Sequence, residues 1–210
     1  MDLGCLTMKQ VSDIINKVKN IVADTSFEAF DDTYLIEFLN QGLDLFCFET
    51  QCIQTSGTIN TIASTSNYSL SSLSEQLITV YEVEFNGTPL DFAPRHEARE
   101  WSTLTSTPTA WSIWGDNLYI NASPSVDQTI TVFYSQLMPI FTAIGDNFGI
   151  GSMEFPRQYE SAIISYIAYR CLAMNNDPNA ANHKFDFDQA KAAATESVNR
   201  QLQSSGYFYA

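Results

Sequence analysis

The chain has 210 residues, of which 45% are hydrophobic, and its formal net charge is −14. This length and apolar content favour a folded core and exclude an intrinsically disordered chain. The 24 acidic residues outnumber 10 basic residues that do not cluster, which excludes a general binding surface for nucleic acid or anionic membranes. We expect no signal peptide, and the most apolar run, residues 162–173, is too short to span a bilayer.

Two helices are predicted before residue 54. Apolar residues recur at helical spacing through residues 8–23, where Thr7 and Gln10 fit a capping box. The pair Asp31-Asp32 is suited to cap a second helix at its positive end. The apolar stripe of that helix contains Leu35, Phe38, Leu39, Leu43 and Phe46.

Gly42 and two cysteines stand out in the second helix. Gly42 costs about 1 kcal/mol relative to alanine inside a helix, and a close approach by another helix would explain it. Cys47 and Cys52 are five residues apart on a predicted helix, so we expect their side chains to point in different directions. Because the chain has no C-x-x-C pair and only two histidines, we expect no zinc site and buried thiols in a reducing cytoplasm.

Residues 77–137 form short runs rich in Thr, Val, Tyr, Trp and Phe, separated by turn residues. The nearly alternating run 77–85 followed by Asn86-Gly87 predicts a hairpin, in which Pro89 restricts the second strand to a sheet edge. A second turn is predicted at Gly115-Asp116-Asn117, and further strands at 58–62, 67–70, 107–114, 118–120 and 129–134. We interpret this part as a small antiparallel sheet inserted between two helical parts.

The C-terminal part is again helical. A third helix is predicted from near Pro156, with a buried stripe that includes Met174, and a fourth from about Asp186 to Gln203. The predicted fold class is therefore α+β: a bundle of about four helices, two N-terminal and two C-terminal, with an inserted small antiparallel β domain. We divide the chain into a helical domain, 1–54 and 138–203, an inserted β domain, 55–137, and a C-terminal tail, 204–210.

Motifs of common enzymes are absent from the sequence: there is no G-x-S-x-G, G-x-x-x-x-G-K-[ST], G-x-G-x-x-G or H-E-x-x-H. His183, Asp186 and Asp188 are residue types that bind metals, but acidic residues at a helix N-terminus are the favoured interpretation. We predict no catalytic residues, no metal and no cofactor, and therefore no enzyme. A small hydrolase with scattered carboxylates ranks last, because no spacing supports it.

Two aromatic groups suggest contact with a partner. Trp111, Trp114 and Tyr119 would allow stacking on a glycan or another ligand, although filling the core of a thin sheet is the favoured interpretation. The odd spacing of Trp111 and Trp114 sends them to opposite faces of a regular strand. The aromatic residues 207–209 form either a frayed terminus or a segment that docks on a neighbour.

Four stretches in a fixed order carry a family resemblance. The run 30–40 is similar to the opening of a second helix, and residues 86–90 form an N-G-x-P-L hairpin. Residues 106–124 contain a T-P-x-x-W strand, a turn and a strand that ends near a proline, and residues 156–159 form a P-x-x-Y helix opening. In these motifs the chain resembles the head-to-tail adaptor proteins of tailed bacteriophages, the ring bound directly under the portal.

The resemblance implies a structural subunit without active-site residues that links the capsid vertex to the tail. It implies a homo-oligomeric ring of about twelve copies in the virion neck, assembled in the host cytoplasm, through which genome DNA passes without specific binding. The helices would build the ring and contact the portal protein, and the β insertion would face the downstream tail or nozzle protein. The implied tail-facing residues are Asn86, Gly87, Gly115, Asp116 and Asn117, and the implied portal-binding residues are Tyr207, Phe208, Tyr209 and Ala210.

Two features depart from the commoner pattern of that family. The Ser/Thr/Asn-rich segment 55–74 and the strong acidity leave open whether the downstream partner is a tail tube or a nozzle. We interpret the acidity as an acidic ring lumen that repels the phosphates of DNA. The alternative function is a non-catalytic glycan- or ligand-binding module that uses Trp111, Trp114 or Tyr119.

Overall fold

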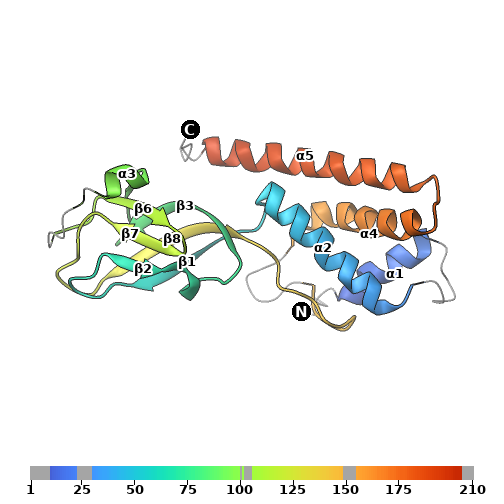
Figure 1. The fold of residues 1–210 in the computed structure, drawn as a ribbon, viewed down its shortest axis with the longest axis horizontal. Coiled ribbons are helices and arrows are strands. Elements are labelled where there is room, and N and C mark those ends of the chain that lie inside the picture. The colour runs from blue at the N-terminus through green and yellow to red at the C-terminus, as the bar shows by residue number, and fades with distance from the viewer. Residues whose placement is uncertain (1–9, 23–29, 100, 102–105, 149–154, 205–210) are drawn as a thin grey trace, which may run out of the picture. The chain divides into compact units, whose positions relative to one another are not determined.

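The computed structural model describes residues 10–22, 30–99, 101, 106–148 and 155–204 (Figure 1). The chain divides into two compact units. One comprises the described residues of Met1–Ile53 and Leu137–Arg200, and the other those of Gln54–Gln136 and Gln201–Ala210. Helices and strands occur together in the chain, which confirms the predicted α+β class.

The helical unit is built from α1 (Val11–Ile21), α2 (Asp32–Thr50), α4 (Glu160–Met174) and α5 (Ala180–Ser204), of which α5 belongs to this unit as far as Arg200. A short 3₁₀ turn, η2 (Arg157–Tyr159), precedes α4. The helices bury one continuous apolar core, whose members include Ile14, Leu35, Leu39, Phe46, Phe141, Phe155, Ile163 and Ile167.

The N-terminal ends of α1 and α2 are capped differently. The Asp31 carboxylate accepts a hydrogen bond from the Tyr34 N–H at 3.0 Å, which confirms the predicted cap of α2. Gln10, however, has an extended backbone and α1 begins at Val11, so the predicted capping box with Thr7 is wrong. The reciprocal contact comes from Asp13, whose carboxylate accepts from the Gln10 N–H at 3.1 Å.

The connection between α4 and α5 is shorter than predicted. The Asp177 carboxylate accepts from the Asn179 N–H at 2.8 Å, and Pro178 follows Asp177, so the chain enters a helix at Ala180 rather than near Asp186. Met174, predicted to be buried, is the last residue of α4 and lies exposed.

Gly42 lies where α2 and α4 approach each other closely. A Cβ atom at Gly42 would lie 2.6 Å from Cδ1 of Tyr166, which confirms the expected close approach by another helix. The Tyr166 ring is buried, and its hydroxyl accepts a hydrogen bond from Arg170 at 2.9 Å. The ring is thus held in place by its surroundings.

Gly42→Ala is therefore expected to destabilise the helical unit by about 1–3 kcal/mol through overpacking, despite the higher helix propensity of alanine. Chemical denaturation followed by far-UV circular dichroism measures the effect. Tyr166→Leu, which removes the clashing ring, is the control: in that background Gly42→Ala should cost less. An equal cost in both backgrounds would contradict the role of the Tyr166 contact.

In its described residues, the β unit contains eight strands in two four-stranded sheets, in the orders β1-β8-β3-β4 and β2-β7-β6-β5. Figure 1 labels most of them. The strands are β1 (Gln54–Asn60), β2 (Asn67–Ser69), β3 (Leu77–Phe85), β4 (Thr88–Pro89), β5 (Asp91–Phe92), β6 (Ala110–Trp114), β7 (Asn117–Ile120) and β8 (Thr129–Gln136). A 3₁₀ turn, η1 (Leu70–Ser72), follows β2, and a short helix, α3 (Arg95–Ala98), follows β5. We had expected one antiparallel sheet; the structure has two, and β5 pairs in parallel with β6 because α3 lies in the crossover between them.

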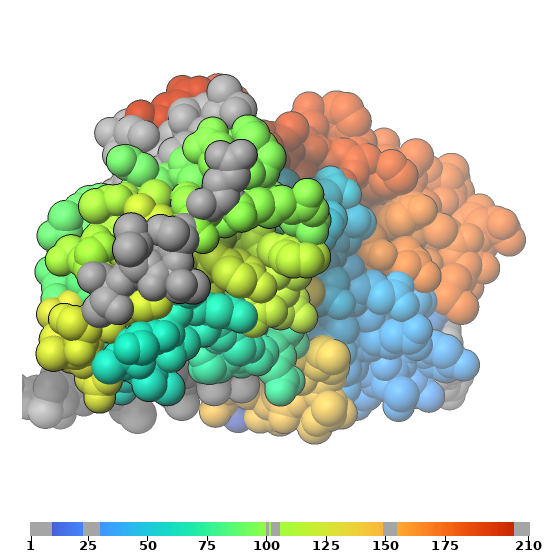
Figure 2. All heavy atoms as spheres, turned by 60° about the vertical axis from the view of Figure 1, so that its left-hand side comes forward, coloured from blue at the N-terminus to red at the C-terminus, as the bar shows by residue number. Residues whose placement is uncertain are grey.

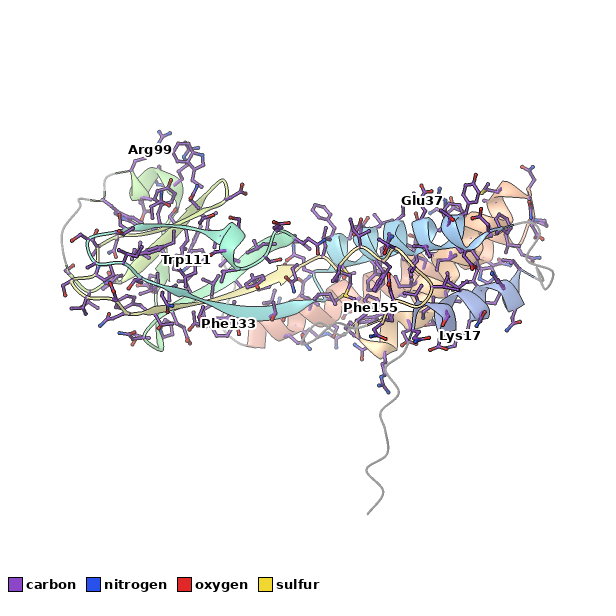
Figure 3. All side chains as sticks on the ribbon, turned by 90° about the horizontal axis from the view of Figure 1, so that it is seen from below. Lys17, Glu37, Arg99, Trp111, Phe133 and Phe155 are labelled. Atoms are coloured by element: carbon purple, nitrogen blue, oxygen red, sulfur yellow. The ribbon has the colours of Figure 1, made fainter. Side chains whose placement is uncertain are left out.

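The β unit has its own apolar core between the sheets. Trp111 lies inside this core, as Figure 3 shows, and its indole N–H donates to the Leu90 carbonyl at 3.1 Å. The other members include Leu70, Val83, Phe85, Leu118, Ile120, Ile130, Val132 and Tyr134.

Candidate partner-binding surfaces

The predicted turn at Asn86-Gly87 joins β3 to β4. Both residues have positive φ, 50° and 75°, as the two central residues of a tight hairpin turn require. Phe85 pairs with Thr88 across the turn, and β4 with Pro89 forms the edge of its sheet, as predicted. Asn86 and Gly87 are exposed, so this turn is accessible.

The turn at Gly115-Asp116 joins β6 to β7, with Asn117 as the first residue of β7. Gly115 has a φ of 57°, and the Asp116 carbonyl accepts from the Leu70 N–H at 2.8 Å, which holds the turn against η1. Gly115 and Asp116 line a groove together with Leu77–Val80, at the start of β3. The Asn86 turn lies at the other end of β3, about 20 Å of strand away, so the structure does not bring the two turns together.

The three aromatic residues proposed for ligand stacking are distributed over two faces. Trp111 is 1% exposed, whereas Trp114 is 56% exposed, which confirms that they lie on opposite faces of β6. The Arg95 guanidinium lies 3.6 Å from the centroid of the Trp114 ring and covers part of it. Tyr119 is half-buried beside Ser112. This arrangement does not form one stacking platform for a glycan.

Residues Tyr207, Phe208, Tyr209 and Ala210, the predicted portal-binding segment, lie outside the described residues. Their role therefore stays a prediction.

A groove of about 510 Å³ in the β unit was missed by the sequence reasoning. Phe92, Trp111 and Ile113 provide apolar lining, and the carboxylates of Glu75 and Asp116 lie at its border. Figure 2 shows the face of the β unit, with the residues of the first strands in cyan and those of β6 and β7 in yellow-green. The available signal was the uncharged start of β3, which reads Leu-Ile-Thr-Val.

The outer face of α2 carries large apolar side chains. Tyr34, Leu45 and Phe48 are exposed and follow one another at intervals close to whole helical turns, together with Glu37 on the same face. Figure 3 shows Glu37 directed away from the helical core. The predicted apolar stripe of α2 did not include these positions, because it followed only the inward face.

Cys47, in α2, and Cys52, which follows α2, are closer together than predicted. Because α2 ends at Thr50 and Gln51 takes a positive φ of 53°, the chain reverses and brings Cys52 beside Cys47. The hydrogen bond between their thiols, together with burial, raises the pKa of Cys47. The same hydrogen bond lowers the pKa of Cys52. The expectation that the two side chains point in different directions is wrong.

Asp188, one of the two acidic residues near His183, forms ion pairs with lysines of the same helix. The Asp188 carboxylate accepts from Lys184 at 2.7 Å and lies 3.5 Å from Lys191, and the hydrogen bond to Lys184 lowers the pKa of Asp188. Since α5 begins at Ala180, Asp186 and Asp188 lie within the helix and not at its N-terminus, where we had placed them. In the described part of the chain, no group of three or more His, Cys, Asp or Glu residues is arranged to hold a metal ion.

A comparison with known families identifies the chain. The model of the SU10 adaptor protein family matches residues 9–206. The chain belongs to this family. Membership confirms the resemblance drawn from the sequence motifs and indicates a structural, non-enzymatic adaptor of a bacteriophage that is part of the virion. No curated protein matches the chain.

The length and composition of the helices also show whether any of them could cross a membrane. Within the described ranges, no helix combines the length and the apolar composition needed to cross a bilayer.

Proposed function

We propose that this chain is a subunit of a phage head-to-tail connector, a ring of about twelve copies that binds under the portal and links the capsid vertex to the tail. The observation that carries the proposal is the match of the SU10 adaptor protein family to residues 9–206, nearly the whole chain. The exposed turns and apolar faces described above support a protein whose surfaces contact other proteins.

Ring formation needs two different surfaces that meet between neighbouring copies. The outer face of α2 supports such a contact, because Tyr34, Leu45 and Phe48 expose apolar area on a helix that is otherwise well packed. The β unit then faces the downstream tail or nozzle protein, which contacts the turns at Asn86-Gly87 and Gly115–Asn117 as two separate patches.

The net charge of −14 suits a ring around DNA. Acidic side chains that face the lumen repel phosphates, so that genome DNA passes without binding. A structure of the ring with most carboxylates on the outer wall would contradict this part of the proposal.

Electron cryomicroscopy of necks from purified virions tests the proposal directly. We expect a ring of this chain between the portal and the tail, with density of the β unit on the tail side. Virions that lack the chain, as shown by mass spectrometry, would overturn the connector function.

Deletion of residues 207–210 tests the C-terminal anchor. We expect binding to the purified portal of the same phage to fall by about a hundredfold or more, because buried aromatic anchors dominate many interfaces. The free energy of unfolding of the monomer should change by less than about 0.5 kcal/mol. Surface plasmon resonance measures the binding, and thermal denaturation measures the stability.

A variant of full length, with Tyr207, Phe208 and Tyr209 all replaced by serine, separates aromatic contacts from chain length. It should lose binding as the deletion does. Portal binding that is unchanged in the deletion variant would contradict the anchor while leaving the ring itself possible.

A further inference from the structure

The first half of β3 has an open edge. In its sheet, β8 pairs with one side of β3 from Leu77 to Phe85, with two register shifts. On the other side, β4 pairs only with Glu84 and Phe85, and the Val83 carbonyl accepts from the Leu90 N–H at 2.9 Å. Among the strands that the structure describes, none pairs with Leu77–Val80 on the side away from β8. The backbone on this side is therefore available to another strand.

The other sheet edges of the β unit are protected by their short length or their composition, whereas this edge is interrupted only by register shifts against β8, between Leu77 and Thr79 and between Val80 and Glu82. Strands β2, β4 and β5 are only two or three residues long, and β4 contains Pro89, while β1 is almost entirely polar. Residues Leu77–Val80 contain neither a charge nor a proline, and all four are partly exposed. An uncharged, apolar edge of this kind pairs readily with other strands unless something covers it.

The groove follows this open edge. Four consecutive residues of β3, Leu77 to Val80, line it. A groove that contacts four consecutive residues runs along the strand, and the register shift between Leu77 and Thr79 interrupts the regular alternation of side chains there. Trp111 and Ile113, two residues apart on β6, share one face and line the groove with Phe92. The groove thus combines a strand edge with an apolar surface, as sites that bind peptides by strand addition do.

The charges around the groove indicate the chemistry of the occupant. Glu75 and Asp116 are exposed at its border, and the residues that line it include no basic side chain. The nearby Arg95 stacks on Trp114 on the opposite face of β6. A basic residue in the occupant would therefore be favoured beside Glu75 or Asp116.

We propose that this groove binds an extended segment of a partner protein, which adds as a strand to the edge of β3 at Leu77–Val80. Alternate apolar side chains of that segment pack on Phe92 and Ile113, and a flanking basic residue pairs with Glu75 or Asp116. The proposal concerns the β unit alone and does not depend on the connector function.

A synthetic peptide tests the proposal with the full chain. The probe is an acetylated peptide of alternating valine and threonine between two terminal lysines. We expect it to bind and to slow hydrogen exchange of the Leu77–Val80 amides. The same peptide with N-methylated alternate residues keeps the side chains but loses backbone donors, so its affinity should be about tenfold lower or worse.

Two variants test whether the peptide binds at the β3 edge of the sheet and not at the opposite edge, β1. Thr79→Lys puts a charge on the open edge and should weaken binding about tenfold or more, as edge charges block strand pairing. Thr58→Lys, the same change on the opposite edge strand β1, should leave binding unchanged. Equal binding of both peptides would overturn strand addition, and so would equal binding to wild type and Thr79→Lys or no protection of Leu77–Val80. The N-methylated peptide keeps the test decisive if Thr79→Lys fails to fold.

Discussion

Trp111→Ala is expected to lower the free energy of unfolding of the β unit by about 3–5 kcal/mol. The side chain is 1% exposed, lies between the two sheets, and packs edge-on against Phe92 with ring centroids 4.9 Å apart. Truncation leaves a cavity that the surrounding strands cannot close, and it removes the donor to the Leu90 carbonyl. Native-state hydrogen exchange of the β6, β7 and β8 amides measures the loss within this unit.

Trp114→Ala is the matched control, since it removes the same side chain three positions along the same strand. Trp114 is 56% exposed and contacts Arg95, so the expected loss is about 0.5–1 kcal/mol. Equal effects of the two substitutions would show that Trp111 does not occupy a closed core. A glycan that binds the wild type but not Trp114→Ala would support the alternative function, a non-catalytic glycan-binding module.

Phe46→Ala should destabilise the helical unit by about 3–5 kcal/mol. Phe46 is fully buried, and its ring lies 5.8 Å from Phe155, 5.3 Å from Tyr159 and 6.0 Å from Phe187, measured between centroids. Phe46 of α2 thus packs against η2, against α5 and against the segment that precedes η2. Urea denaturation followed by circular dichroism at 222 nm, where the helices dominate, measures the change.

Phe48→Ala, two positions further along α2, is the control. Phe48 is 63% exposed, so the stability of the monomer should change by less than about 0.5 kcal/mol. If the outer face of α2 contacts a neighbouring copy, Phe48→Ala should nevertheless weaken ring assembly, which analytical ultracentrifugation detects. A large loss of monomer stability in Phe48→Ala would contradict its placement on the surface.

Local features of the fold were predictable because they depend on a few consecutive residues. The aspartate at position 31 caps α2 through its own side chain, and Asn86-Gly87 adopts the positive φ angles that few other dipeptides tolerate. The alternation of Trp111 and Trp114 across β6 follows from strand geometry alone. Both turns of the candidate tail-facing surface were therefore placed correctly as turns.

Features that depend on residues distant in the chain were predicted less well. The short strands carry too little information to choose between one sheet and two, and the parallel β5–β6 pair depends on a crossover. The contact between Cys47 and Cys52 depends on where α2 ends, since a helix continued past Thr50 would keep them apart. The groove beside β3 was missed, because the uncharged sequence of Leu77–Val80 indicates a strand but not the side on which that strand lacks a partner.

The sequence by itself determined the α+β class, the order of helices and strands, the cap of α2, the tight turns, and the ordered motifs that indicate a phage adaptor. Hydrophobic periodicity and turn chemistry act over short distances, so they can be read along the chain. Only the tertiary structure decided that Gly42 meets Tyr166, that the two turns lie at opposite ends of β3, and that Leu77–Val80 is left with an open edge. Packing and strand pairing join residues far apart in the chain, and the same local pattern is compatible with several such pairings.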